Sequence, residues 1–307
     1  MGASIGLDEP EPGNIMRQLS AFSRNIAQIL VAEYPGLKKV LAPAVQYGNE
    51  SDMYYDDPEL VDVLASEWNA AVPVFPFIHE TSDQEPLKPK FHEKMAQLLS
   101  LCRRFGTRNI TVHLPIDPAD KTAELLNEMC SPRFLKLVRD SCVSIDLENN
   151  WHACWFGFAD HLVDFYAALD RRLDSEGNGK MKEWFGMTFD SGHFFAQYRI
   201  AGRKNRPDLD RLFTALGDRI RTLHLHGNDG TGDQHKCFVP LRDDLARDDM
   251  FAGNQQDLLA CLPALDLANR ARSGKWDIVI VSELCEPFTR DVYLDHSRIL
   301  FDAILKK

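Results

Sequence analysis

The sequence lacks the patterns that identify several common classes of protein. No apolar run reaches the roughly 18 to 20 residues that a membrane-spanning helix needs. The N-terminal segment MGASIGLDEPEPG has no basic stretch followed by an apolar one, so no secretory signal is expected. The 7 cysteines include no CxxC pair, which favours reduced thiols over a disulfide framework. These features predict a cytoplasmic protein that is not bound to membranes.

Positive charge is also scarce. The chain has 35 lysines and arginines against 46 aspartates and glutamates, so its formal net charge is -11. Proteins that bind duplex nucleic acid usually present clustered Lys and Arg to the phosphates. The best basic cluster is RIAGRKNR at 199–206, and such a run is usually a solvated helix end. Nucleic acid is therefore not expected as a partner.

Local signatures of nucleotide binding and of hydrolases are missing as well. The sequence contains no GxGxxG fingerprint, no GxxxxGK[ST] loop, no GxSxG elbow and no HExxH pair. No pattern points to a serine or cysteine triad. Any chemistry must therefore come from residues that the fold gathers from distant parts of the chain.

The chain does contain a repeated alternation of short apolar runs and longer segments of helical period. The apolar runs predict strands at 3–7, 38–44, 72–79, 109–115, 142–148, 186–190, 221–227 and 277–283. Helical patterns cover about 13–33, 57–70, 88–105, 118–140, 158–173, 207–217, 255–271 and 290–306. This order predicts an α/β fold, a (β/α)8 TIM barrel of parallel strands. No linker divides the chain, so residues 1–307 are expected to form a single domain.

Most of the predicted strands end in a side chain that can bind a metal ion. These side chains are His79, His113, Glu148, Asp190, His226 and Glu283. In a closed barrel the C-terminal strand ends meet at one mouth, so these residues are expected to converge. Further candidates lie just beyond the strand ends, namely His193, Asp233 and His235.

The types of side chain limit which ion such a site would hold. Carboxylates and imidazoles without clustered thiolates suit Zn²⁺, Mn²⁺, Co²⁺ or Mg²⁺, and they argue against copper or an iron–sulfur cluster. His224 has the same strand parity as His226, so it is expected to point inward one layer deeper, as a hydrogen-bonded support and not as a ligand. The other histidines are expected at the surface or in local packing: His92, His152, His161 and His296.

In order and placement, the motifs ITVH, DLENN, FDSGH, HLHGND with DQH, and VSE resemble those of the xylose isomerase-like barrels, from about residue 70 to the end. This family includes sugar isomerases and epimerases together with endonuclease IV. The resemblance implies one divalent ion held by Glu148, Asp190, His226 and Glu283. It also implies that His193 contacts the substrate or the metal.

Endonuclease IV extends the resemblance, because it holds three zinc ions with additional histidines and an Asp-x-His pair. The matching positions are His79, His113, Asp233 and His235. One ion is expected here, and two or three remain an alternative. The chain departs from the family after the Asp-x-His pair, where it reads HKCFVPLRDDL in place of a Pro- and Gly-rich turn. The resemblance therefore does not extend to the turn that follows Asp233 and His235.

The resemblance implies a metal-dependent isomerase or epimerase of a sugar or sugar phosphate. The ion would polarise the carbonyl of the open-chain sugar and stabilise the enediolate that forms when a proton is lost. Glu148 and Glu283 would act as the acid–base pair on opposite faces of this enediolate, with His193 as a third catalytic candidate. The side chains expected to contact the sugar are His79, His113 and Trp151.

Other activities remain open for the same residues. An endonuclease IV-like zinc phosphodiesterase acting on abasic DNA would use the same ligands. The predicted mouth loops GNESDMYYDDPE, ETSDQEP and LRDDLARDDM are acidic, however, which disfavours a DNA-binding face. Lyase chemistry on an oxidised sugar would begin with the same proton abstraction, and an inactive metal-binding subunit is a further alternative. The sugar, the metal and the oligomeric state stay open, and a homo-oligomer is compatible with the sequence.

Overall fold

The computed structural model describes residues 12–35, 44–48, 62–63, 66, 75–79, 86–104, 106–151, 154–202, 206–228, 235, 279–282, 293–295, 297–298 and 301. Within these ranges, 7 strands form one sheet in the order of the sequence, and all neighbours are parallel. The strands are β1 (Ala44–Gly48), β2 (Phe75–His79), β3 (Asn109–His113), β4 (Ser144–Glu148), β5 (Phe185–Asp190), β6 (Ile220–Leu225) and β7 (Val279–Ser282).

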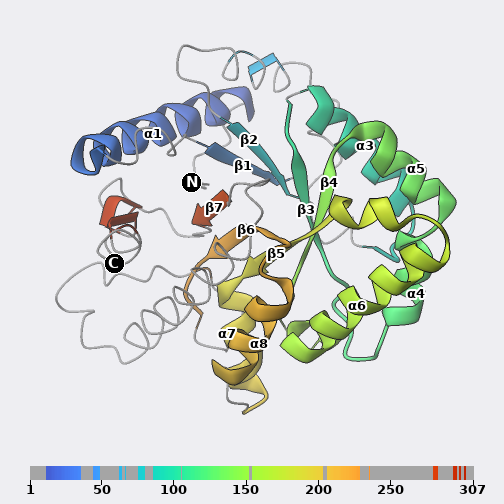
Figure 1. The fold of residues 1–307 in the computed structure, drawn as a ribbon. Coiled ribbons are helices and arrows are strands. Elements are labelled where there is room, and N and C mark those ends of the chain that lie inside the picture. Colours follow the sequence, from blue (N-terminus) through green and yellow to red (C-terminus); the bar gives the residue numbers. More distant parts are fainter. Residues whose placement is uncertain are drawn as a thin grey trace.

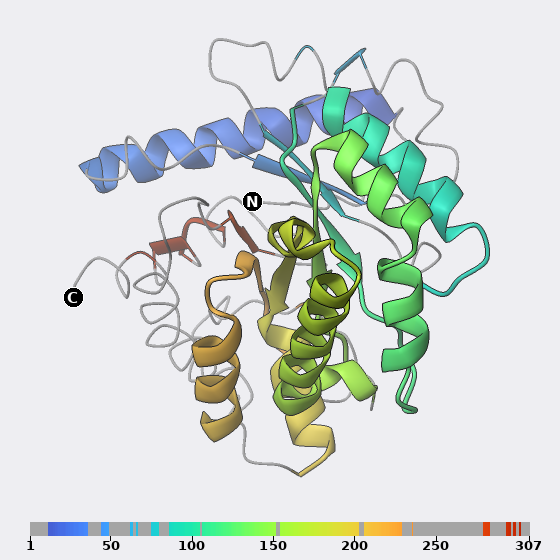
Figure 2. The same cartoon turned by 45° about the vertical axis from the view of Figure 1, so that its right-hand side comes forward.

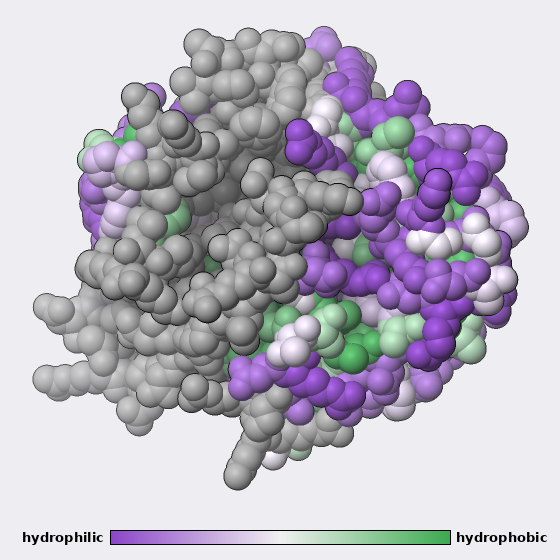
Figure 3. All heavy atoms as spheres, in the orientation of Figure 1, coloured by the Kyte–Doolittle hydropathy of each residue, from purple (hydrophilic) through white to green (hydrophobic). Residues whose placement is uncertain are grey.

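Helices surround the outer face of this sheet (Figures 1 and 2). They are α1 (Pro12–Glu33), α3 (Phe91–Arg104), α4 (Thr122–Met129), α5 (Pro132–Ser141), α6 (Ala159–Ser175), α7 (Ser191–Ile200) and α8 (Arg206–Leu216), with 3-10 turns η3 (Trp155–Gly157) and η4 (Gly179–Trp184). Hydrophilic side chains cover most of the described outer surface in Figure 3. In the described part of the chain, no helix is both long and apolar enough to cross a bilayer.

The order of strands and helices agrees with the predicted barrel, with two corrections. The strand predicted at 38–44 is wrong in its end, because β1 continues to Gly48 in pairing with Phe75–His79; residues 38–43 lie outside the described ones. The helix predicted at 118–140 is two helices. Ser131 caps the second one by accepting a hydrogen bond from the Phe134 amide at 3.2 Å, and Pro132 follows in the first turn. The strand predicted at 3–7 and the helix predicted at 255–271 lie outside the described residues.

Contacts between strands that are not neighbours show that the sheet is curved into a barrel. The Thr111 hydroxyl on β3 lies 2.7 Å from the Thr188 hydroxyl on β5. Asn109 on β3 donates to the Thr222 hydroxyl on β6 at 3.2 Å. In a flat sheet, strands two places apart are about 10 Å from each other, so such contacts require strong curvature. The interior of the barrel is therefore narrow and filled by side chains.

The two faces of the strands differ sharply in polarity. On β4, Ile145 and Leu147 belong to the main hydrophobic core between the sheet and the helices. The alternate residues Ser144, Asp146 and Glu148 point to the barrel interior, and all three are buried. TIM barrels usually fill this interior with branched apolar residues. Here it is lined on β3 to β6 by hydrogen-bonding groups, which lead up to the mouth.

A charged pair lies at the base of this polar interior. The Arg221 Nη1 atom is 3.2 Å from Asp146 Oδ1, and its Nη2 atom donates to the Glu183 carbonyl at 2.6 Å. Asn109 donates to the other Asp146 oxygen at 2.6 Å. Burial raises the pKa of the Asp146 carboxyl above its ordinary value, although Arg221 pulls it in the opposite direction.

Two local features make room for this pair. Met187 pairs with Ile220 and Thr188 with Thr222, so β6 has one extra residue at this point, and that residue is Arg221. Beside it, Gly186 leaves the space that the pair occupies, because a Cβ atom there would lie 2.2 Å from Asp146 Oδ1. A bulge and a glycine thus admit a guanidinium into the barrel.

The charged pair yields a double-mutant prediction for stability. Because each partner is almost fully buried, Arg221→Met or Asp146→Asn alone should lower the free energy of unfolding by about 3 kcal/mol. Both changes together should cost clearly less than the sum of the two single losses, since the double variant has no uncompensated buried charge. Urea unfolding of the four proteins measures these values, and strictly additive losses would show that the pair is not coupled.

Candidate metal centre

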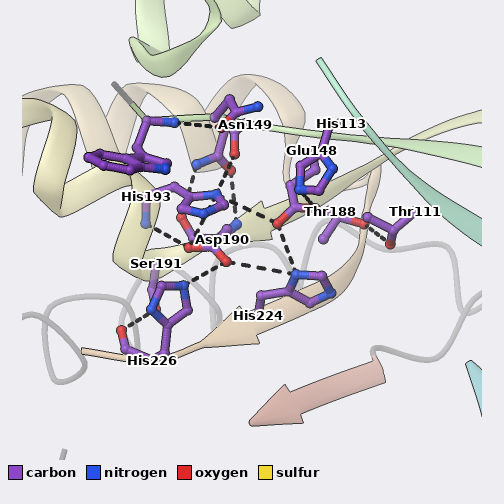
Figure 4. A network of polar contacts seen from close by, with 12 residues as sticks. Thr111, His113, Glu148, Asn149, Thr188, Asp190, Ser191, His193, His224 and His226 are labelled. Carbon is purple, nitrogen blue, oxygen red and sulfur yellow. Dashed lines mark hydrogen bonds and ion pairs between the residues drawn. The ribbon is translucent and has the colours of Figure 1, made fainter. Parts of the chain in front are cut away.

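The C-terminal ends of β3 to β6 bring imidazoles and carboxylates together at the barrel mouth (Figure 4). The parallel ladders set the positions, because His113 pairs with Glu148 across β3 and β4. Asp190 likewise pairs with His224 across β5 and β6. His226 comes two residues after His224, and its side chain is buried beside Asp190. Strands far apart in the sequence thus place their terminal side chains in one cluster.

Glu148 lies at the centre of the imidazoles and is fully buried. Its Oε1 atom accepts a hydrogen bond from His224 Nδ1 at 2.9 Å. His113 Nε2 lies 3.4 Å from the other oxygen, Oε2. His193 Nδ1 is 3.8 Å from Oε1. The carboxylate is therefore held at one oxygen and approached by a ring at the other.

Asp190 is the second fully buried carboxylate, and it begins α7. Its Oδ1 atom caps the helix by accepting from the His193 amide at 2.7 Å. Its Oδ2 atom accepts from His226 Nε2 at 2.9 Å and lies 3.7 Å from His224 Nδ1. His224 Nδ1 thus stands between the two carboxylates, close to an oxygen of each.

The partners of the rings indicate which nitrogen of each ring can bind a metal. His193 Nδ1 lies 3.1 Å from the Asn149 carbonyl, which can only accept, so this nitrogen carries the proton and Nε2 holds the lone pair. In His226 the Asp190 carboxylate takes the hydrogen bond from Nε2, which leaves the lone pair on Nδ1. His226 Nδ1 is buried and has no hydrogen-bond partner among the described residues. A buried acceptor of this kind fits a metal ligand better than a packing residue.

Two adjacent groups of side chains could each hold an ion. Glu148, Asp190 and His224 form one group, and His193, His226 and His235 form the other; in each group the ligand atoms lie within 4.8 Å of one another. The His226 and His235 rings are stacked, with centroids 4.1 Å apart. Two buried carboxylates require positive charge nearby, and oxygen with imidazole ligands suits borderline divalent cations. The residues present therefore fit a divalent metal ion.

The structure brings together most of the site residues predicted from sequence. Those gathered in the cluster are His113, Glu148, Asp190, His193, His226 and His235. For His79 the structure describes the backbone, which ends β2 and pairs with Thr111. Glu283, which directly follows β7 in the sequence, and Asp233 lie outside the described residues. Their roles stay predictions.

Other predicted side chains have clearer surroundings. His224 makes the hydrogen bond expected of a supporting residue, and its place beside both carboxylates also gives it a ligand atom. Trp151 is half-buried, and its amide donates to Asn150 Oδ1 at 2.9 Å. Phe195 and Tyr198 belong to the hydrophobic core. His161 stacks on Trp155 at 3.8 Å, which is local packing.

Asn149 is a part of this region that the sequence did not single out. Its side chain bonds to the backbone of Asp190, which lies 41 positions away in the chain. In the sequence Asn149 lies within the DLENN motif, directly after Glu148. No pattern of spacing connects it with Asp190.

Comparisons with known proteins identify the fold. No family model matches the chain, and no curated protein matches its sequence. Among solved structures, a D-tagatose 3-epimerase-like protein superposes with a TM-score of 0.60 at 17% identity, over 91% of this chain and 94% of that one. The IOLI protein with a binding zinc atom superposes with a TM-score of 0.58 at 17% identity, over 86% of this chain and 88% of that one. A xylose isomerase-like TIM barrel protein from Mycobacterium smegmatis, in complex with magnesium, superposes with a TM-score of 0.54 at 14% identity. The match covers 96% of this chain and 90% of that one. The chain therefore has the xylose isomerase-like TIM barrel fold that the sequence predicted.

The close approach of Gly192 to His226 gives a prediction for metal binding. A Cβ atom at Gly192 would lie 2.1 Å from His226 Cε1 and 2.3 Å from Nδ1, so Gly192→Ala must displace the ring from Asp190. Affinity for Mn²⁺ should fall by about tenfold or more. The rise in melting temperature on adding Mn²⁺ measures the loss. Ser191→Ala is the matched control, because its hydroxyl only reaches the His226 carbonyl at 3.5 Å. Equal responses of the two variants would contradict the expected ligand role of His226.

Proposed function

We propose that the protein is a divalent-metal-dependent isomerase or epimerase of a sugar or sugar phosphate. The observation that carries this proposal is the pair of fully buried carboxylates, Glu148 and Asp190, set among imidazoles at the barrel mouth. The fold supports it, since solved structures that share this barrel include a D-tagatose 3-epimerase-like protein and proteins that hold zinc or magnesium. A bound divalent ion would supply polarisation of the sugar carbonyl.

The ligands that we assign to this ion are Glu148, Asp190, His226 and Glu283. Burial supports the first three, and for His226 so does the buried Nδ1 atom, which has no hydrogen-bond partner among the described residues. His193, His113, His79, Asp233 and His235 are assigned as further ligands if the site holds two or three ions. The imidazole group His193, His226 and His235 supports that larger site. Zn²⁺, Mn²⁺, Co²⁺ and Mg²⁺ all suit these donors, and availability decides among them.

Glu148 acts as the base in the proposed reaction. Its Oε1 atom is held by His224, so Oε2 is the oxygen that takes a proton from the carbon next to the sugar carbonyl. Glu283 returns a proton at the opposite face, which inverts that carbon and makes the reaction an epimerisation. If the carboxylate that removed the proton instead delivered it to the neighbouring carbon, the reaction would be an isomerisation. His193 stands 3.8 Å from Glu148 and is assigned to hold a proton or a sugar hydroxyl.

The substrate class follows from the same surroundings. His113 approaches Glu148 Oε2 at 3.4 Å, so a sugar oxygen near this carboxylate would be within reach of its ring. Trp151 lies three residues beyond the end of β4 and is half-buried, which suits a ring that covers one face of a sugar. Both are assigned as sugar contacts, with His79 as a third. The proposed partner is a small sugar and not a nucleic acid.

Hydrolysis of a phosphodiester in abasic DNA is the alternative function. The observation in its favour is that His113 and His235 join the cluster, which gives more imidazoles than a single ion needs. The net charge of -11 is against it, because a duplex-binding face needs Lys and Arg on several loops. The sugar enzyme therefore remains the preferred proposal.

The test is exchange of sugar protons with solvent. Protein loaded with Mn²⁺ or Co²⁺ is incubated in D₂O with a panel of ketoses and ketose phosphates, and deuterium next to the carbonyl is measured by NMR. Glu148→Gln and Glu283→Gln should each lower the exchange rate by about 100-fold or more, because each removes a proton-transfer group. Glu128→Gln is the control, since Glu128 also contacts a histidine, His92, but lies on α4.

The result also separates the two functions. Cleavage of an abasic-site oligonucleotide without any sugar exchange would replace the proposal with the phosphodiesterase. Exchange that is equally fast in Glu148→Gln and in the unmodified protein would contradict the role of Glu148. Absence of both activities in the metal-loaded protein would overturn both functions.

A further inference from the structure

The side chain of Asn149 extends the pairing of β4 with β5 beyond the end of the strands. The last backbone pair of this ladder is Glu148 with Thr188. One residue further, the Asn149 side chain takes over: its Nδ2 atom donates to the Asp190 carbonyl at 2.9 Å. The Asp190 amide donates back to Asn149 Oδ1 at 2.9 Å. An amide side chain thus pairs with both backbone polar groups of Asp190 just beyond the end of the ladder.

This bridge joins the residues that carry the two carboxylates. Asn149 follows Glu148 directly, and its side chain hydrogen-bonds to both the backbone amide and the backbone carbonyl of Asp190. Its own carbonyl lies 3.1 Å from His193 Nδ1. It is fully buried, so water does not compete for these bonds. The Asp190 backbone therefore has little freedom to move relative to Glu148.

We propose that Asn149 is the positioning residue that fixes the separation between the Glu148 and Asp190 carboxylates and, through its own carbonyl, the orientation of the His193 ring. The inference rests on the metal site of the proposed function and adds to it a residue that touches neither metal nor substrate. Supporting bonds of this type typically change metal affinity by about 10- to 100-fold when they are removed. Without the Asn149 side chain, Asp190 would still cap α7 through the His193 amide, but its backbone would lose both hydrogen bonds to the end of β4.

Asn150 provides a matched control. It is the same residue type, is almost as deeply buried, and also makes two side-chain hydrogen bonds. Its Nδ2 atom donates to the Leu114 carbonyl at 3.1 Å, and its Oδ1 atom accepts from the Trp151 amide at 2.9 Å. One bond leads to the loop after β3 and the other to the next residue of its own segment, and neither leads to Asp190. Loss of either asparagine should cost similar stability, about 1–3 kcal/mol for buried partners left unpaired.

The first experiment compares Mn²⁺ binding by Asn149→Ala and Asn150→Ala in titrations monitored by electron paramagnetic resonance. Asn149→Ala should weaken Mn²⁺ binding by about 10- to 100-fold, while Asn150→Ala should bind close to the unmodified protein. Asn149→Ser is the milder variant if the alanine form does not fold, because serine cannot reach both polar groups of Asp190. Equal weakening in both asparagine variants would overturn the inference in favour of a general structural role, and so would no weakening in either.

A second readout does not depend on metal or activity. In metal-free protein labelled with ¹⁵N-histidine, the ring signals of His193 and His226 report their bonds to Asn149 and Asp190. Asn149→Ala should shift these signals and Asn150→Ala should leave them in place. If the unmodified protein binds no Mn²⁺, the proposed function fails, and the ring signals alone still decide on Asn149. Unchanged His193 and His226 signals in Asn149→Ala would overturn its positioning role.

Discussion

The structure at the barrel mouth depends on two carboxylates that are buried side by side. Glu148 and Asp190 are fully buried, and each has an oxygen close to His224 Nδ1, at 2.9 and 3.7 Å. Two such groups repel each other in a medium of low polarity unless positive charge or strong hydrogen bonds compensate them. The imidazoles supply the hydrogen bonds, and a divalent cation would supply the charge. This requirement explains why so many histidines gather here.

The rest of the barrel is built to keep these carboxylates in place. Below them the interior is polar, and the pair of Asp146 and Arg221 holds its base. Glycines stand where a side chain would collide with the polar groups, at Gly186 beside Asp146 and at Gly192 beside His226. Above, Asn149 ties the end of β4 to the end of β5. A polar interior of this kind stabilises a barrel less than an apolar one would.

Much of this could be predicted from the sequence, for a simple physical reason. Alternation of apolar and helical segments defines a βα repeat, and parallel strands bring their ends to one edge, so Glu148, Asp190 and His226 were expected to meet. Strand limits were less accessible, because Ala44–Gly48 is fixed by its pairing with Phe75–His79. The break between α4 and α5 had a readable signal in Ser131 and Pro132. The bulge at Arg221 and the bridge from Asn149 to Asp190 had none, since each depends on contacts between distant segments.

The central claim is that the cluster is a divalent metal site, and metal content tests it most directly. Protein purified without an affinity tag or added metal should contain about one ion per chain by inductively coupled plasma mass spectrometry, exchangeable for Mn²⁺ or Co²⁺. Two or three tightly held zinc ions would extend the site to the histidine group and favour the phosphodiesterase. A chain that holds no ion, even after Mn²⁺ is supplied, would contradict the account.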